Sequence, residues 1–235
     1  MKEVMNLRRR FLMMSGLLVV GGVVLVGSPA SVAQVTKSGS KYQLRMKWSK
    51  GAKLGYNLEM KQVGGSSAPM KMGIDYVVSS VKGTSGVVDV TVKGMGQEPQ
   101  KEKLTIDNRG RSTGGSTSGF GNILEFPQEA VAIGGTWKTK ANLPGMGGGS
   151  MTGTATNTLK GFRTEGGKQF AHVVTDLKTT GGGVTGAGTT NTLISMADGH
   201  IFRSSMNLKM SVSMKDSNGK PVNQSVNMAI TMTRK

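Results

Sequence analysis

The chain has 235 residues, no cysteine and a formal net charge of +17, from 30 Lys and Arg against 13 Asp and Glu. The absence of cysteine excludes disulfides, thiol catalysis and a lipid anchor on cysteine. So positive a charge favours anionic partners such as lipid headgroups or acidic polymers, although the solvated surface of a β protein can carry the same charge.

Residues 1–33 have the three parts of a secretory signal peptide. A basic segment with three arginines at 8–10 precedes an apolar run over 11–26, and Ser31-Val32-Ala33 offers small residues for cleavage after Ala33. The alternative is an uncleaved anchor, for which the apolar run is short. Residues 8–12 also resemble a twin-arginine export signal. We expect an exported protein, periplasmic or extracellular, by the Sec or the twin-arginine route.

Residues 34–235 are long enough for a single β domain with its own core. We expect the polar residues 34–40 to be frayed. Apolar and polar residues then alternate over 42–48 and 54–60, which is the period of a strand with one buried face. The turn at 50–52 predicts that these two strands form a hairpin in which Trp48 faces Leu54.

Further strands are predicted where alternation or runs of β-branched residues recur, at 70–78, 87–92, 103–106, 136–139, 151–159, 169–177 and 189–196. The glycine-rich segments 112–122 and 143–150 are typical of loops. Residues 123–132 are the one place where we expect a short helix.

The clearest alternation runs from residue 202 to 214 and places on one face Phe202, Met206, Leu208, Met210, Val212 and Met214. A second apolar face follows over 222–232. A two-residue Asn218-Gly219 turn would set Met214 against the polar Asn223. A three-residue turn over 217–219 sets Met214 against Val222 and keeps apolar residues opposite each other. We predict this second register.

These elements predict an all-β fold with little helix: an antiparallel meander of about ten long strands. Strands of this length twist and coil, so we expect them to form a barrel or half-barrel. No fixed repeat period is visible, which argues against a solenoid or propeller.

No catalytic constellation is visible, so we expect a non-enzymatic protein without a cofactor. His200 follows Asp198-Gly199 and is expected to be an exposed turn residue. His172 lies within a strand, where a hydrogen-bonded structural role is more common than catalysis. The carboxylates form no paired motif, and residues 181–188 lack the context of a phosphate-binding loop.

Methionine is unusually frequent, with 17 residues. Three interpretations stay open: core filling, an adaptable apolar cavity, and soft-metal binding. The third depends on Met70 and Met72, which share one strand face; we expect no metal site in the absence of cysteine.

Residues 126–137 read Phe-Pro-Gln-Glu-Ala-Val-Ala-Ile-Gly-Gly-Thr-Trp. This segment resembles one that recurs in exported bacterial β-rich proteins of uncharacterised function, and Asp198-Gly199 before a long strand fits the same pattern. The resemblance implies a single exported β domain and supplies no catalytic residues. At the level of fold alone, the chain is similar to the half-barrel carriers of periplasmic lipoproteins.

Two functions of different classes follow. The first is binding of an apolar or lipidic ligand on a Met-rich concave face, with the candidate lining Trp48, Tyr56, Phe202, Met206 and Met210. The second is a structural or adhesive envelope module that binds anionic polymers or a membrane surface through a basic outer face, with Lys41, Arg45, Lys47, Arg203 and Lys209. The low aromatic content, 5%, argues against nucleic acid. The oligomeric state stays open.

Overall fold

The computed structural model describes residues 34–94, 97–113, 124–144, 150–181, 184–215 and 221–235. The chain divides into two compact units, 1–32 and 33–235, and only the second is considered below. The signal-peptide prediction falls outside the described residues. The part of the chain that is described contains strands and no helix, and therefore no helix able to span a membrane.

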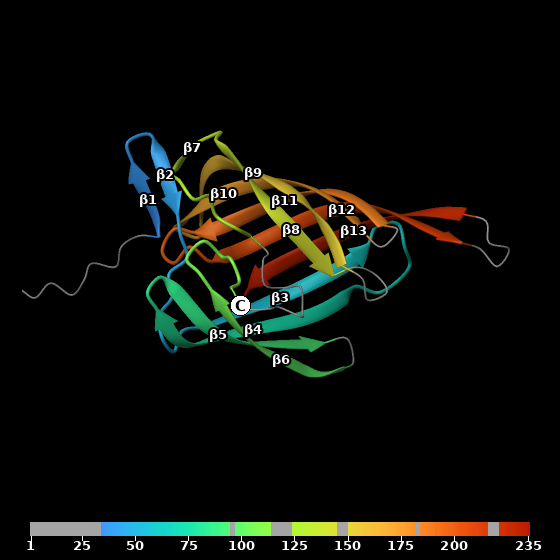
Figure 1. The fold of residues 1–235 in the computed structure, drawn as a ribbon, viewed down its shortest axis with the longest axis horizontal. Helices are drawn as coiled ribbons and strands as arrows, with labels where there is room; N and C mark the ends of the chain where they lie inside the picture. The colour runs from blue at the N-terminus through green and yellow to red at the C-terminus, as the bar shows by residue number, and fades with distance from the viewer. Residues whose placement is uncertain (1–33, 95–96, 114–123, 145–149, 182–183, 216–220) are drawn as a thin grey trace, which may run out of the picture. The chain divides into compact units, whose positions relative to one another are not determined.

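Ten strands form one antiparallel sheet, drawn in Figure 1. The strands are β3 (Lys53–Gln62), β4 (Met70–Lys82), β5 (Ser85–Gly94), β6 (Gln97–Ile106), β8 (Thr136–Pro144), β9 (Ser150–Glu165), β10 (Lys168–Gly181), β11 (Val184–Ser195), β12 (Ile201–Lys215) and β13 (Pro221–Arg234). The prediction of an all-β antiparallel fold is therefore confirmed.

The sheet consists of two meanders joined side by side. Its strand order is β6-β5-β4-β3-β13-β12-β11-β10-β9-β8, so β3 pairs with the last strand of the chain. The two edges, β6 and β8, do not pair, and the sheet is not a closed barrel. The segment between β6 and β8 consequently runs from one edge of the sheet to the other.

A small second sheet corrects three predictions for the first and middle parts of the chain. It contains β1 (Val35–Ser38), β2 (Lys41–Leu44) and β7 (Val131–Ala132), so residues 34–40 are not frayed. β2 pairs with β1 and β7, whereas β3 pairs with β13 and β4, and the hairpin of Trp48 with Leu54 does not form. No described part of 123–132 is helical.

The register of the last hairpin is confirmed. β12 and β13 pair with Met214 opposite Val222 and Met210 opposite Val226. The turn residues 217–219 lie outside the described residues. At its other end β12 contains a bulge, because Ile201 pairs with Ile194 and Arg203 with Leu193.

This bulge corrects the predicted position of Phe202. Phe202 has no pairing residue on β11, and its ring stacks on that of Phe170 with 4.5 Å between centroids. The neighbouring Ile201 takes the buried position and is 6% exposed. The alternation therefore holds from Ser204 to Met210.

The inward face of the sheet carries two apolar clusters. The larger one contains the fully buried Ile74, Leu104, Phe126 and Leu159, and the smaller one gathers around Leu177, Leu208 and Met210. Met72 and Met232 are also buried, whereas Met70 is exposed. Burial of each large apolar side chain contributes about 1.5–3 kcal/mol to folding. Close packing is thus one established use of the methionines.

Candidate functional site

The segment that follows β6 begins with a turn organised by Asp107. One carboxylate oxygen of Asp107 accepts hydrogen bonds from the backbone N–H groups of Arg109 and Arg111, both at 2.9 Å, and the other accepts one from Arg111 Nε at 2.8 Å. Burial alone would raise the pKa of Asp107, but these hydrogen bonds outweigh burial and lower it.

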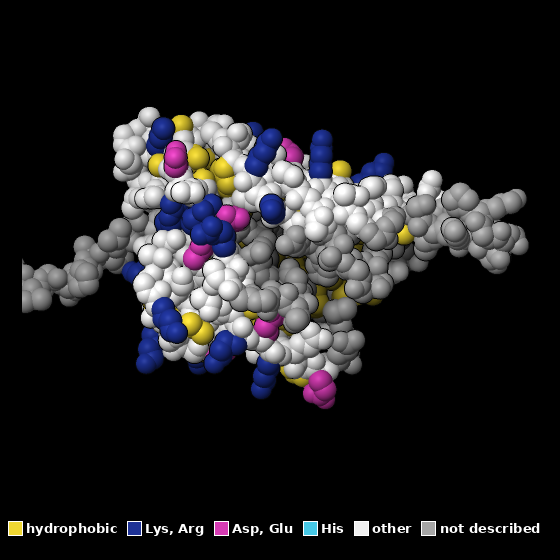
Figure 2. All heavy atoms as spheres, in the orientation of Figure 1, with side chains coloured by type: hydrophobic (Ala, Val, Ile, Leu, Met, Phe, Trp, Pro, Cys, Tyr) yellow, Lys and Arg dark blue, Asp and Glu magenta, His cyan; other side chains and the backbone are white. Residues whose placement is uncertain are grey.

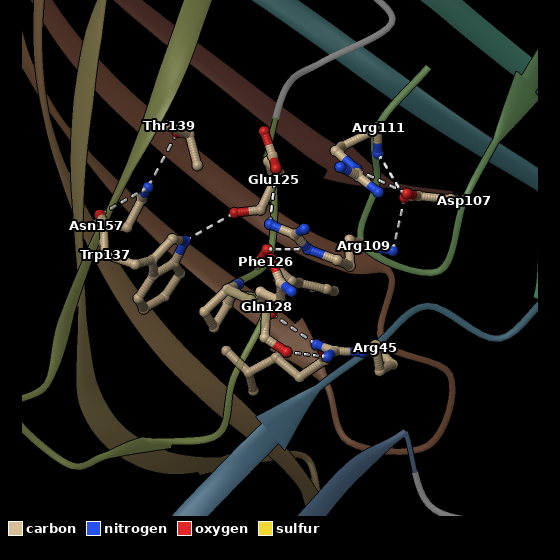
Figure 3. Close-up of polar contacts among 12 residues, drawn as sticks. Arg45, Asp107, Arg109, Arg111, Glu125, Phe126, Gln128, Trp137, Thr139 and Asn157 are labelled. Carbon is tan, nitrogen blue, oxygen red and sulfur yellow. Dashed lines mark hydrogen bonds and ion pairs between the residues drawn. The ribbon is translucent and has the colours of Figure 1, made fainter. Parts of the chain in front are cut away.

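Arg109 connects this turn to residues 125 and 126, which lie later in the same segment (Figure 3). Its Nε donates to the Phe126 carbonyl at 2.9 Å, and its guanidinium forms an ion pair with Glu125 at 2.8 Å. Trp137, at the start of β8, donates its indole N–H to the Glu125 carbonyl at 2.8 Å. Figure 2 shows basic side chains gathered between acidic ones where Figure 1 draws this segment.

The linker between β2 and β3 lies against the same segment. The Arg45 guanidinium donates to the carbonyls of Leu44, Pro127 and Gln128, and the backbone N–H of Met46 donates to the Asn108 carbonyl at 2.7 Å. Burial and the nearby Arg109 lower the pKa of Arg45. These contacts place Met46 and Trp48 beside the turn that precedes β12 (Met196–His200).

His200 in that turn is buried, and the prediction that it is exposed is wrong. It is 5% exposed, its ring lies 4.9 Å from that of Trp48, and its Nε2 is 3.0 Å from the Lys47 carbonyl oxygen. Since a carbonyl only accepts, Nε2 carries the proton of the neutral ring. Burial lowers the pKa of His200.

Asp198 fixes the same turn. It forms an ion pair with Arg234 at 2.7 Å and accepts the backbone N–H of His200 at 3.1 Å. Burial alone would raise the pKa of Asp198, but these contacts outweigh burial and lower it. The last strand of the sheet is thereby linked to the turn that carries His200.

A cavity of about 60 Å³ lies among these elements. Of the five predicted ligand-binding residues, Trp48 and Tyr56 line this cavity. Met206 and Met210 belong to the second apolar cluster, and Phe202 stacks on Phe170, so the five do not form one surface. Burial raises the pKa of the cavity residue Tyr76 to about 12. Sequence alone missed the other nine members, among them Met46, Tyr76, His200 and Met232, because nothing in the local pattern joins them.

A much larger groove, about 1070 Å³, lies along β8–β13. It is lined by polar residues, among them Lys138, Lys178, Lys209 and Asp176, and by apolar residues, among them Val63, Leu177, Leu208 and Met228; no aromatic residue is among the described residues that line it. Thr154 and Thr156 on β9 also line this groove.

The predicted basic outer face is not continuous. Lys209 lines the groove, but Arg203 is paired with Glu165 at 2.9 Å, and the Arg45 guanidinium is held by backbone carbonyls. Lys41 lies on β2 in the small sheet and Lys47 in the linker after it. Only Lys209 therefore contributes to a larger basic surface.

His172 Nε2 donates a hydrogen bond to Asn191 Oδ1 at 3.2 Å, and His172 is 8% exposed. Burial lowers the pKa of His172.

The described residues contain no cluster of three His, Cys, Asp or Glu side chains able to hold a metal ion. Neither protein-family models nor curated protein sequences give a match to this chain. Its function is therefore argued from its own chemistry.

Proposed function

We propose that the protein is exported and binds an extended anionic polymer, such as an acidic polysaccharide or a polyol phosphate, across the outward face of β8–β13. The observation that carries this proposal is a row of six residues on the outward face of β8–β13 that includes three lysines, two of which, Lys178 and Lys209, also line the groove. The strand pairings align one residue from each strand between β8 and β13. In order across the sheet these residues are Lys140, Thr154, Lys178, Ala187, Lys209 and Asn227.

The spacing of these lysines suits a linear ligand. Lys140, Lys178 and Lys209 lie on every second strand, and adjacent strands are about 4.8 Å apart, so consecutive lysines of the row are separated by about 9.5 Å. A polymer with one acidic group in each repeat could contact several of them at once. The Thr and Asn side chains between them can bond to hydroxyl groups of such a chain.

No described acidic residue forms an ion pair with Lys140, Lys178 or Lys209. By contrast, three exposed lysines of the other meander are paired: Lys71 with Glu59, Lys93 with Asp75 and Lys103 with Asp89. Figure 2 shows several basic side chains projecting from the upper edge of the view, where Figure 1 places β9–β12.

The test compares two triple variants, each of which removes three positive charges. K140Q/K178Q/K209Q removes the unpaired row, and K71Q/K93Q/K103Q removes three paired lysines. We expect the wild-type protein to bind a soluble polyuronate, to lose affinity as salt is added, and to be weakened about tenfold or more by the first triple change only. Equal weakening by both triples, or no binding by the wild type, would contradict the proposal.

A second candidate is an apolar or lipidic ligand on the inward face, favoured by two buried hydroxyl groups. Thr179 and Thr190 are 5% and 7% exposed, and their Oγ1 atoms have no hydrogen-bond partner in the described part of the chain. Thr190 pairs with Met206. Thr179 pairs with Gly186, which in turn pairs with Met210. Native mass spectrometry of the purified protein tests this candidate, because a bound lipid would survive as a discrete mass increment.

A further inference from the structure

Three residues that carry possible metal-binding groups line the 60 Å³ cavity, which is separate from the polymer groove. They are Met46 and Met232, which carry thioethers, and His200, which carries an imidazole. They come from the linker after β2, from β13 and from the turn before β12, so no sequence motif joins them. Trp48 lines the same cavity, with its ring 4.9 Å from that of His200.

The imidazole is held as a metal-binding histidine usually is. Its Nε2–H donates to the Lys47 carbonyl at 3.0 Å, and the backbone N–H of His200 donates to Asp198 at 3.1 Å. Histidines that bind metals typically donate their second ring N–H to a carbonyl or carboxylate in this way. Nδ1 therefore retains the lone pair of a neutral ring, and no described residue donates a hydrogen bond to it.

The types of ligand atom determine which metal ion such a site prefers. Thioethers are soft ligands that favour Cu(I), and imidazole also suits copper, whereas Mg²⁺ and Ca²⁺ require oxygen ligands. A small cavity favours a bare ion over a hydrated one, and a monovalent cation needs the least charge compensation in a buried site. The Trp48 indole can add a cation–π interaction.

We infer that this cavity binds one Cu(I) ion through Met46, Met232 and His200. The inference departs from the sequence expectation of no metal site and differs from the soft-metal interpretation of Met70 and Met72. Met70 is exposed, and neither residue lines the cavity.

The test is a competition titration of the folded protein with Cu(I) against a coloured Cu(I) chelator, under ascorbate and without oxygen. We expect one ion per chain. Loss of an outer-shell partner alone typically costs about 10- to 100-fold in affinity, so M46L and M232L should each cost at least about 100-fold. The matched changes M70L and M206L should leave the affinity unchanged, as should K140Q/K178Q/K209Q.

X-ray absorption at the copper edge supplies a readout that needs no variant. For the wild type we expect sulfur and nitrogen neighbours together. Only oxygen and nitrogen neighbours, the absence of Cu(I) binding, or a loss of affinity in M70L but not in M46L and M232L would each overturn the inference. Because M46L and M232L nearly conserve side-chain volume, they should unfold at denaturant concentrations close to that of the wild type.

Discussion

Arg109 and Phe126, 17 residues apart, are joined by two hydrogen bonds. The Phe126 backbone N–H donates to the Arg109 carbonyl at 2.8 Å, and Arg109 Nε donates back to the Phe126 carbonyl at 2.9 Å. Phe126 is fully buried in the larger apolar cluster. The segment that connects the unpaired edges β6 and β8 is thus anchored by both polar bonds and apolar burial.

Truncation of Phe126 should therefore be severely destabilising. Phe126→Ala leaves a cavity in the larger cluster, and changes of this kind cost about 3–5 kcal/mol in free energy of unfolding. Val63, which is 54% exposed, supplies the control, because Val63→Ala should change stability by less than about 0.5 kcal/mol. Urea denaturation of both variants measures the difference, and similar midpoints would show that the segment does not anchor the fold.

Gly199 should tolerate no side chain. Its φ of +71° is in the left-handed region, and an added Cβ would collide with the Arg45 carbonyl oxygen. Gly83 has a similar φ of +57° but open space around it. Gly83→Ala should cost about 1–2 kcal/mol for the backbone conformation alone, and Gly199→Ala should cost clearly more. Equal losses in thermal unfolding would mean that the linker can move aside.

The register of β12 and β13 can be tested by cross-linking, because the natural chain has no cysteine. Asn207 pairs with Ala229. Paired residues have Cα atoms about 4.5–5.5 Å apart, within the range of a disulfide. Asn207→Cys with Ala229→Cys should therefore oxidise readily, whereas Asn207→Cys with Ile230→Cys, the register of a two-residue turn, should not. Mass spectrometry of oxidised samples distinguishes the two outcomes.

The buried turn before β12 should make stability pH-dependent. Burial lowers the pKa of His200 in the folded state, so the unfolded chain binds the proton more readily and stability should fall as the pH drops below about 6.5. The pKa of Asp198 is also lowered, and its contribution, present above about pH 4, should be lost at lower pH.

Two variants separate these losses. His200→Gln should reduce the decline that starts near pH 6.5, and Asp198→Asn should reduce the decline at lower pH, to which Asp107 also contributes; urea midpoints between pH 7.5 and 3 measure both. His172, whose pKa burial also lowers, should contribute to the first decline in the same direction. A wild-type midpoint that stays constant from pH 7 to 5 would contradict the assignment.

The sequence by itself determined most strands of the large sheet and one register. Alternation with a period of two is local information, so β4, β5 and β9–β13 lie where their patterns predict them. The pairing of Met214 with Val222 followed from matching apolar faces across a short turn. The alternating pattern did not predict the bulge at Phe202, because Ile201 and Phe202 are both apolar and either could take the buried position.

Tertiary structure alone decided the rest, because it depends on contacts between distant residues. The pairing of β3 with β13, the unpaired edges β6 and β8, and the burial of His200 against Lys47 all join segments far apart in the chain. The lysine row has the same origin, since its members lie on strands β8, β10 and β12, and only the combined registers of four strand pairs align them. Local patterns specify which face a side chain takes, but only long-range pairing specifies its neighbours.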